Sequence, residues 1–218
     1  DGSAEQRQDC TACQTQGGEL TPELGAARVG NITASRIKDM LADGKGVTRA
    51  KYAAQLASER MTGKPHRSAF GSASIEHGNE TEAMARMQYE IRNGVMVIES
   101  GYVPHPHIKR AGCTPDGLVG DEGLVEFKCP DSHTFLTYKL KGEIPRAYRL
   151  QMIWQLACTG RKWNDYSPYD PDFLEQDAWL QLRLTPTEAE ISDMEKEVIK
   201  FYIEVEQLIQ SIIERRTK

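Results

Sequence analysis

Cys113 to Cys129 reads CTPDGLVGDEGLVEFKC, a pattern that predicts a β-hairpin. Asp116 lies on the first arm, the segment GDEG supplies the turn, and Leu124 to Lys128 alternates with a period of two. In an extended arm, Glu126 and Lys128 point to one face of the sheet, and their neighbours point to the other. Because the arms of a hairpin run antiparallel, we expect Asp116 to lie beside Glu126.

This hairpin would gather two carboxylates and one ammonium at one edge of a sheet. Two hard oxygen ligands side by side suit Mg²⁺ or Mn²⁺. A neighbouring lysine can orient or deprotonate a water molecule. The alternative is an ordinary surface hairpin with an exposed Glu–Lys pair, since Glu-x-Lys is common by chance.

The size and composition of the chain indicate a globular protein. It has 218 residues, of which 39% are hydrophobic and 27% are charged, enough for one well-buried domain. We expect a flexible N-terminal arm over 1–20 and a single domain over 21–218. No apolar run reaches the ~18 residues of a membrane span, and no secretory signal opens the chain. The odd count of five cysteines disfavours a disulfide framework and fits a reducing cytoplasm.

Charge is unevenly distributed along the chain, whose net charge is −5. Residues 26–67 hold nine Lys/Arg against three Asp/Glu, whereas residues 170–218 hold six against twelve. A basic face on an acidic body is compatible with localised phosphate contact, although charge also fluctuates along chains without function.

Outside the hairpin, the pattern predicts several helices and strands. Helices are expected over 35–41, 47–61, 72–92, 131–140, 144–158 and from 188 onward, and strands over 95–98, 163–169 and 178–184. Pro104 and Pro106 are expected to interrupt the strand pattern. The last helix carries an apolar stripe at three- and four-residue spacing, which favours core packing but also suits a subunit contact: Ile191, Met194, Val198, Phe201, Val205, Leu208 and Ile212.

Two pairs of potential metal ligands are isolated in the sequence. Cys10 and Cys13 form a single CxxC without the second pair that a zinc site needs. His105 and His107 alternate beside prolines, which is more typical of a surface loop than of a metal site.

Two further groups of polar residues are candidates for binding. Arg28 and Ser35 flank a predicted helix start, which could form a phosphate cradle or an ordinary helix cap with a surface arginine. Tyr148, Gln151 and Gln155 fall on one side of the 144–158 helix. If buried, the glutamines need partners, either a hydrogen bond in the core or a phosphate.

Four ordered motifs resemble those of the lambda-exonuclease-like (YqaJ viral recombinase type) alkaline exonucleases, within the PD-(D/E)xK nuclease superfamily. They are RVGNITAS at 28–35, the helical Gly78-x-x-x-Glu82, the TPDG and EFKCP of the hairpin at 114–117 and 126–130, and YRLQ at 148–151. The resemblance covers about residues 20–215. It implies an α/β (α+β), restriction-endonuclease-like fold with a mixed central β-sheet flanked by helices.

The resemblance also implies an activity. Members of this family are Mg²⁺-dependent 5′→3′ exonucleases that digest one strand of linear double-stranded DNA from 5′-phosphorylated ends. The 3′ single-stranded tails then serve phage-type recombination through a Redβ-like single-strand annealing protein. A ring-shaped homotrimer, a toroid with DNA in its channel, in the cytoplasm of a bacterial host is implied as well.

The resemblance assigns catalytic and metal-binding roles by position. Two Mg²⁺ ions, with Mn²⁺ as a substitute, would be held by Asp116 and Glu126, helped by Glu82 and the main-chain carbonyl of Phe127. Lys128 would position or activate the attacking water, and Gln151 would support the Lys128 side chain from its helix.

The resemblance assigns DNA-binding roles in the same way. Arg28, Ser35 and Thr114 match positions that hold the terminal 5′ phosphate in the lambda enzyme of that family. Thr114 stands where that enzyme has serine. Lys45 falls where the family reaches toward the DNA end. His133 lies near an arginine of the family, so a charged contact there becomes dependent on pH.

Two alternative functions remain open from the sequence. The same core could belong to an endonuclease, which would also cut covalently closed circles. It could also belong to a nuclease-like DNA-binding module without catalysis, although the intact Asp116, Glu126 and Lys128 set speaks against that.

Overall fold

The computed structural model describes residues 22–42, 47–66 and 72–216 of the chain. The expected N-terminal arm over 1–20, with Cys10 and Cys13, lies outside the described residues, and so does Lys45.

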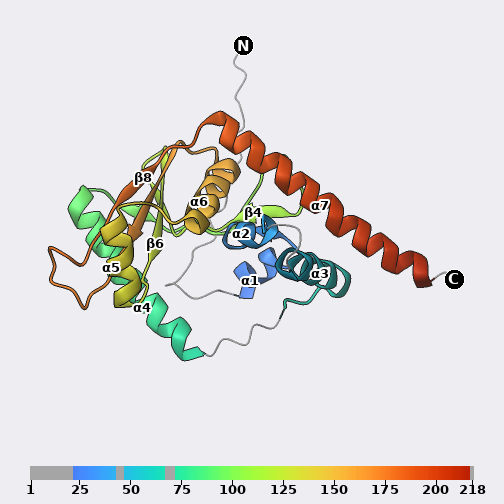
Figure 1. Cartoon of the computed structure of the whole chain (residues 1–218), viewed down its shortest axis with the longest axis horizontal. Helices are drawn as coiled ribbons and strands as arrows, with labels where there is room; N and C mark the ends of the chain where they lie inside the picture. The colour runs from blue at the N-terminus through green and yellow to red at the C-terminus, as the bar shows by residue number, and fades with distance from the viewer. Residues whose placement is uncertain (1–21, 43–46, 67–71, 217–218) are drawn as a thin grey trace, which may run out of the picture.

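A mixed five-stranded sheet forms the centre of the molecule (Figure 1). In spatial order its strands are β2 (Val97–Ile98), β5 (Gly117–Val119), β6 (Gly123–Lys128), β7 (Trp163–Pro168) and β8 (Leu182–Leu184). Only β6 and β7 run parallel to each other; the other neighbours are antiparallel. The expected mixed sheet with flanking helices is therefore confirmed.

The predicted hairpin is present as β5 and β6. Gly117 pairs with Val125, so the residue before it, Asp116, stands across from Glu126. Gly120 in the turn has a φ of 52°, a left-handed conformation that glycine adopts without steric cost. The local pattern thus sets the register that the site requires.

A second sheet of three strands was not predicted. Its order is β1 (Ile32–Thr33), β4 (Ala111–Cys113) and β3 (Val103–Pro104). The expected break in the strand pattern is present but falls one residue later, because β3 includes Pro104 and ends there. Pro104 pairs with Gly112 on an edge strand, where the missing N–H of proline is tolerated.

Most predicted helices are present with small shifts of their ends. The helices are α1 (Pro22–Arg28), a 3-10 turn (Ala34–Arg36), α2 (Ile37–Met40), α3 (Val47–Thr62), α4 (Ser72–Asn93), α5 (Ser132–Lys141), α6 (Arg146–Thr159) and α7 (Glu188–Arg216). The structure adds α1 and divides the expected 35–41 helix. The strand expected over 178–184 is shorter, because only Tyr169 and Trp179 bridge before β8 begins.

Helices α4 and α6 cover opposite faces of the large sheet. Tyr89 of α4 packs edge-on against Phe127 of β6, with ring centroids 6.0 Å apart. Glu126, on the other face of the same strand, hydrogen-bonds to glutamines of α6. The predicted alternation along β6 is therefore confirmed.

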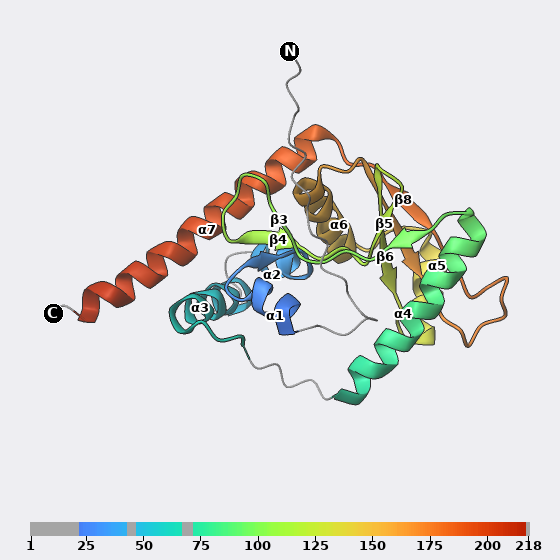
Figure 2. The same cartoon turned by 180° about the vertical axis from the view of Figure 1, so that it is seen from behind.

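Helix α7 packs against α3 and α6 and then extends past α3 to the C-terminal end (Figures 1 and 2). Met194, Val198, Phe201 and Val205 are buried, which confirms core packing for the first part of the stripe. Farther along the stripe, Ile212 is 37% exposed. None of the described helices is both long and apolar enough to cross a membrane.

His105 corrects the expectation of a surface loop at His-x-His. Its ring is buried and stacks on Trp154, with centroids 5.0 Å apart. Its Nδ1 accepts hydrogen bonds from the backbone N–H groups of His107 and Ile108. Since Nδ1 is an acceptor, the proton lies on Nε2, which is 3.1 Å from Glu195. His105 therefore holds a loop in place as a neutral ring.

This arrangement predicts acid-sensitive stability. Burial lowers the pKa of His105 despite the opposing effect of Glu195. A lowered folded-state pKa means that the unfolded chain takes up the proton first, so stability is present above about pH 6.5 and is lost as pH falls below it. We expect His105→Gln to cost about 1–3 kcal/mol at pH 8 and to flatten this decline. Thermal unfolding at pH 8, 7, 6 and 5 measures both effects.

Exposed His107 provides the matched control, because His107→Gln removes a histidine from the same loop without removing a buried acceptor. If His105→Gln and the wild type lose melting temperature in parallel between pH 7 and 5, this account of His105 is wrong.

Candidate active site

The hairpin and α6 bring the predicted catalytic side chains together. Glu126 has a fully buried side chain, and Lys128, two residues farther along β6, retains 24% of its side-chain exposure. Asp116, just before β5, is half-buried. Gln151 reaches the same point from α6 and donates to Glu126 Oε1 at 2.5 Å.

The two carboxylates of the hairpin differ in their hydrogen bonding. Asp116 Oδ2 accepts one hydrogen bond, from the backbone N–H of Phe127 at 2.9 Å. Glu126 accepts from three side chains: Lys128, Gln151 and Gln155. Burial and the neighbouring Glu126 raise the pKa of Asp116 well above its usual range. Asp116 therefore resists ionisation beside Glu126, because the single ammonium of Lys128 does not neutralise two carboxylates.

Lys128 is a hydrogen-bond donor in this arrangement. Burial acts to lower the pKa of Lys128, but Glu126 and Asp116 outweigh burial and raise the pKa above its usual value. Its Nζ also lies 5.3 Å from the centroid of the Tyr148 ring. The ammonium form can orient a water molecule, whereas deprotonating one would require the loss of its own proton first.

Glu82 lies on α4 at the border of this group. Burial raises its pKa, while Lys128 and Arg86 act in the opposite direction and Glu126 adds to the rise. Within the described ranges, no three His, Cys, Asp or Glu side chains gather closely enough to hold a metal ion. Glu82 is thus in electrostatic range of the hairpin carboxylates without completing a three-carboxylate cluster.

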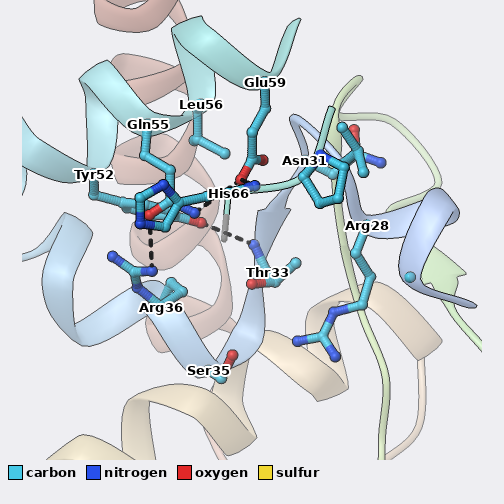
Figure 3. Close-up of a pocket in the computed structure, with 13 residues that line it drawn as sticks. Arg28, Asn31, Thr33, Ser35, Arg36, Tyr52, Gln55, Leu56, Glu59 and His66 are labelled. Carbon is cyan, nitrogen blue, oxygen red and sulfur yellow. Dashed lines mark hydrogen bonds between the residues drawn. The ribbon is translucent and has the colours of Figure 1, made fainter. Parts of the chain in front are cut away.

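The predicted phosphate cradle corresponds to a cavity of about 210 Å³ (Figure 3). Arg28 and Ser35 line it, and Figure 3 shows both on the same side of Thr33, away from His66. The Arg28 guanidinium has no hydrogen-bond or ion-pair partner among the described residues. Its charge is therefore available to an anion.

Thr114 is not among the residues that line this cavity, but it leaves the small sheet at the same end as Ser35. Thr33 of β1 pairs with Gly112 in the parallel strand β4. Two residues after this pair, β1 leads to Ser35 and β4 leads to Thr114. The Thr114 hydroxyl is buried and has no hydrogen-bond partner among the described residues. An unpartnered hydroxyl can donate to an anion, and the Arg28 guanidinium carries a positive charge that an anion could pair with.

The far side of the cavity is already hydrogen-bonded. Glu59 accepts from the backbone N–H groups of Gly30 and His66 and from Gln55. Arg36 donates to Gln55 and Asp39. Free polar groups thus lie toward Arg28 and Ser35.

His133 lies apart from these groups on the first turn of α5. Its side chain is 87% exposed, and its Nδ1 is 2.9 Å from Oδ1 of Asp131. Asp131 also caps the helix by accepting from the Thr134 N–H. His133 is accessible to a ligand but is not part of the buried site.

The sequence left the partner of Gln155 open, and it gave no indication of Arg86. Gln155 donates to Glu126 Oε2 at 2.6 Å, and its four-residue spacing from Gln151 was the signal available. Arg86 of α4 donates to the main-chain oxygen of Asp116 at 3.3 Å and pairs with Glu99. Nothing in the local sequence around Arg86 indicated that contact.

A mixed sheet whose hairpin brings two carboxylates and a lysine together, with Gln151 of α6 donating to one carboxylate, fits the core of a nuclease. The chain belongs to the YqaJ-like viral recombinase domain family, which matches residues 24–162.

Solved structures agree with this assignment. The chain is 36% identical to the alkaline exonuclease LHK-Exo from Laribacter hongkongensis, covering 90% of this chain and 98% of that one, with a TM-score of 0.84. LHK-Exo in complex with dAMP gives 0.85 at the same identity and coverage. The protein is therefore a DNA exonuclease of the alkaline exonuclease and viral recombinase type.

A phage-related exonuclease from Haemophilus somnus 129PT shares the fold at 13% identity, with a TM-score of 0.68 over 84% of this chain and 96% of that one. A comparison with curated proteins finds no match.

Proposed function

We propose that this exonuclease digests one strand of linear double-stranded DNA in the 5′→3′ direction, starting from a 5′-phosphorylated end. The observation that carries the proposal is the Arg28 guanidinium, without a partner among the described residues, in a cavity that Ser35 also lines, in a chain that carries the Asp116–Glu126–Lys128 hairpin. A terminal phosphate has the charge and the acceptor oxygens that these groups lack.

Mg²⁺ fits the hairpin by charge and by ligand chemistry. Two carboxylates with one ammonium leave an excess of negative charge, which the raised pKa of Asp116 reflects. Hard oxygen ligands prefer Mg²⁺ or Mn²⁺. Asp116, Glu126 and the Phe127 carbonyl would hold the ions, with Glu82 assisting from α4. Bound metal would stabilise charge on the attacking and leaving oxygens of the phosphodiester.

The protein side chains would divide the remaining work. Lys128, held by Glu126 and by the face of Tyr148, would orient the attacking water through its ammonium hydrogens. Gln151 would keep the Glu126 carboxylate in place from α6. Arg28, Ser35 and Thr114 would hold the terminal phosphate. The scissile bond would then be positioned at the carboxylates of the hairpin.

The resemblance to the family also supports a proposal about the wider setting. The 3′ single strands would be passed to a Redβ-like single-strand annealing protein in the cytoplasm of a bacterial host. A homotrimeric ring around the DNA would retain an acidic protein on its substrate, with Lys45 and His133 contacting the duplex. A sedimentation mass equal to one chain would remove the ring.

Arg28→Ala should weaken the preference for phosphorylated ends. A bidentate or charge-assisted contact to phosphate is lost, so digestion of 5′-phosphorylated duplex should fall on the order of 10- to 100-fold. Digestion of the 5′-hydroxyl duplex should be nearly unchanged, because that end never used the guanidinium. Initial rates on the two substrates measure the ratio.

Lys38→Ala is the control for this prediction, since Lys38 is an exposed basic residue nearby on α2. An equal loss on both kinds of end in Arg28→Ala would contradict the assignment of Arg28 to the terminal phosphate.

The function itself is tested with three substrates in Mg²⁺ and in chelator: a linear duplex with 5′ phosphate, the same duplex with 5′ hydroxyl, and a covalently closed circle. We expect Mg²⁺-dependent loss of the phosphorylated strand, with the circle intact. Nicked or linearised circles would instead indicate an endonuclease. Digestion starting from 3′ ends, followed with a 3′ label, would reverse the proposed direction.

A further inference from the structure

We propose that Gln155 and Asn164 form a buried amide relay that positions Glu126 for metal binding. Neither residue would touch the metal or the DNA, so both are positioning residues. This inference rests on the proposed function, because it assigns a role to the shell around the same site.

The first link joins α6 to the hairpin. Gln155 Nε2 donates to Glu126 Oε2 at 2.6 Å, and both side chains are fully buried. Gln151 and Lys128 donate to the other oxygen, Oε1. Gln155 is therefore the side-chain donor that holds Oε2 and fixes the rotation of the carboxylate plane.

The second link joins β7 to α6. Asn164 Nδ2 donates to Gln155 Oε1 at 2.7 Å, and Asn164 is also fully buried. A carboxylate can only accept, so Gln155 must present its Nε2 to Glu126. Its Oε1 then faces Asn164, which must present Nδ2. The Glu126 carboxylate therefore fixes the orientation of the Gln155 amide, and Gln155 in turn fixes the orientation of the Asn164 amide.

The cost of Asn164 argues for a positioning role. Within the part of the chain that the structure describes, its Oδ1 is buried without a hydrogen-bond partner, which is unfavourable in a protein core. An apolar side chain at this position would have no such unsatisfied atom. What Asn164 contributes is the orientation of Gln155, and through Gln155 the orientation of Glu126. Mutation of a group that orients a metal ligand in this way commonly weakens metal affinity 10- to 100-fold.

Binding of Mn²⁺ to the full chain without DNA, measured by calorimetry, tests the relay without relying on activity. We expect Gln155→Leu and Asn164→Leu each to weaken Mn²⁺ binding by about 10- to 100-fold. Because Asn164 acts only through Gln155, adding Asn164→Leu to Gln155→Leu should weaken binding no further. Circular dichroism confirms that each variant is folded.

Ser167→Ala is the matched control. Ser167 lies on the same strand, is fully buried and has an unpartnered hydroxyl, but it points to the opposite face of the sheet. Mn²⁺ affinity should remain at the wild-type value in this variant.

The outcomes separate the relay from the metal site. Wild-type affinity in a folded Asn164→Leu or Gln155→Leu variant, or additive losses in the double variant, would overturn the relay and leave the metal site standing. A loss in Ser167→Ala equal to that in Asn164→Leu would also overturn it, since any change in β7 would then suffice. Absence of Mn²⁺ binding by the wild type would overturn both.

Discussion

Asp116→Asn should reduce digestion of linear duplex DNA on the order of a thousandfold. The variant removes one of the two carboxylates that we propose as metal ligands while keeping an oxygen that can accept from the Phe127 N–H, the contact that Asp116 makes now at 2.9 Å. The loss should therefore come from metal binding and charge stabilisation rather than from misfolding. Initial rates in Mg²⁺ and calorimetric Mn²⁺ titration measure the two effects.

The same variant should be more stable than the wild type when metal is chelated. The folded-state pKa of Asp116 is raised, so stability is lost as pH rises from the unfolded-state pKa of about 4 to the folded-state pKa, and the loss persists above it; the neutral amide avoids this cost. A higher melting temperature together with lost activity is the signature of a functional site that is strained without its ligand.

Asp121→Asn controls for the change of charge, because Asp121 is an exposed carboxylate in the turn of the same hairpin. Near-normal digestion by Asp116→Asn, with the variant folded, would exclude Asp116 as a metal ligand.

Lys128→Met should lower the rate of digestion by about 100- to 1,000-fold while leaving metal binding intact or tighter. Methionine keeps much of the side-chain volume but removes the ammonium that donates to Glu126 and that, in our proposal, orients the attacking water. Removing a positive charge beside the carboxylates favours a bound cation. A loss of rate without a loss of Mn²⁺ affinity distinguishes Lys128 from Asp116.

Lys162→Met is the matched control, since Lys162 is an exposed lysine paired with Glu122 of the hairpin turn. Full activity in Lys128→Met would refute a catalytic role for this residue. Greatly weakened Mn²⁺ binding would show instead that its main effect is to hold the carboxylates.

The sequence by itself determined the hairpin and the side chains it presents. The period-two alternation after a glycine-rich turn specifies which residues share a face, and antiparallel pairing then places Asp116 across from Glu126. The long helices were also predictable, because each carries its own periodic pattern over many residues.

Tertiary structure decided the features that depend on partners distant in the chain. Short strands such as β1 form because a neighbour supplies hydrogen bonds, here Ala111 opposite Ile32. His105 is buried because Trp154, some fifty residues later in the sequence, provides the surface on which its ring stacks.

The shell around Glu126 belongs to this second category. Helical spacing placed Gln155 on the same side of α6 as Gln151, but it could not say that a carboxylate lies there or that Asn164 stands behind it. Local periodicity fixes the direction in which a side chain points. Only the packing of β7 and α6 against the hairpin fixes what it meets, because those contacts join residues that no short-range pattern relates.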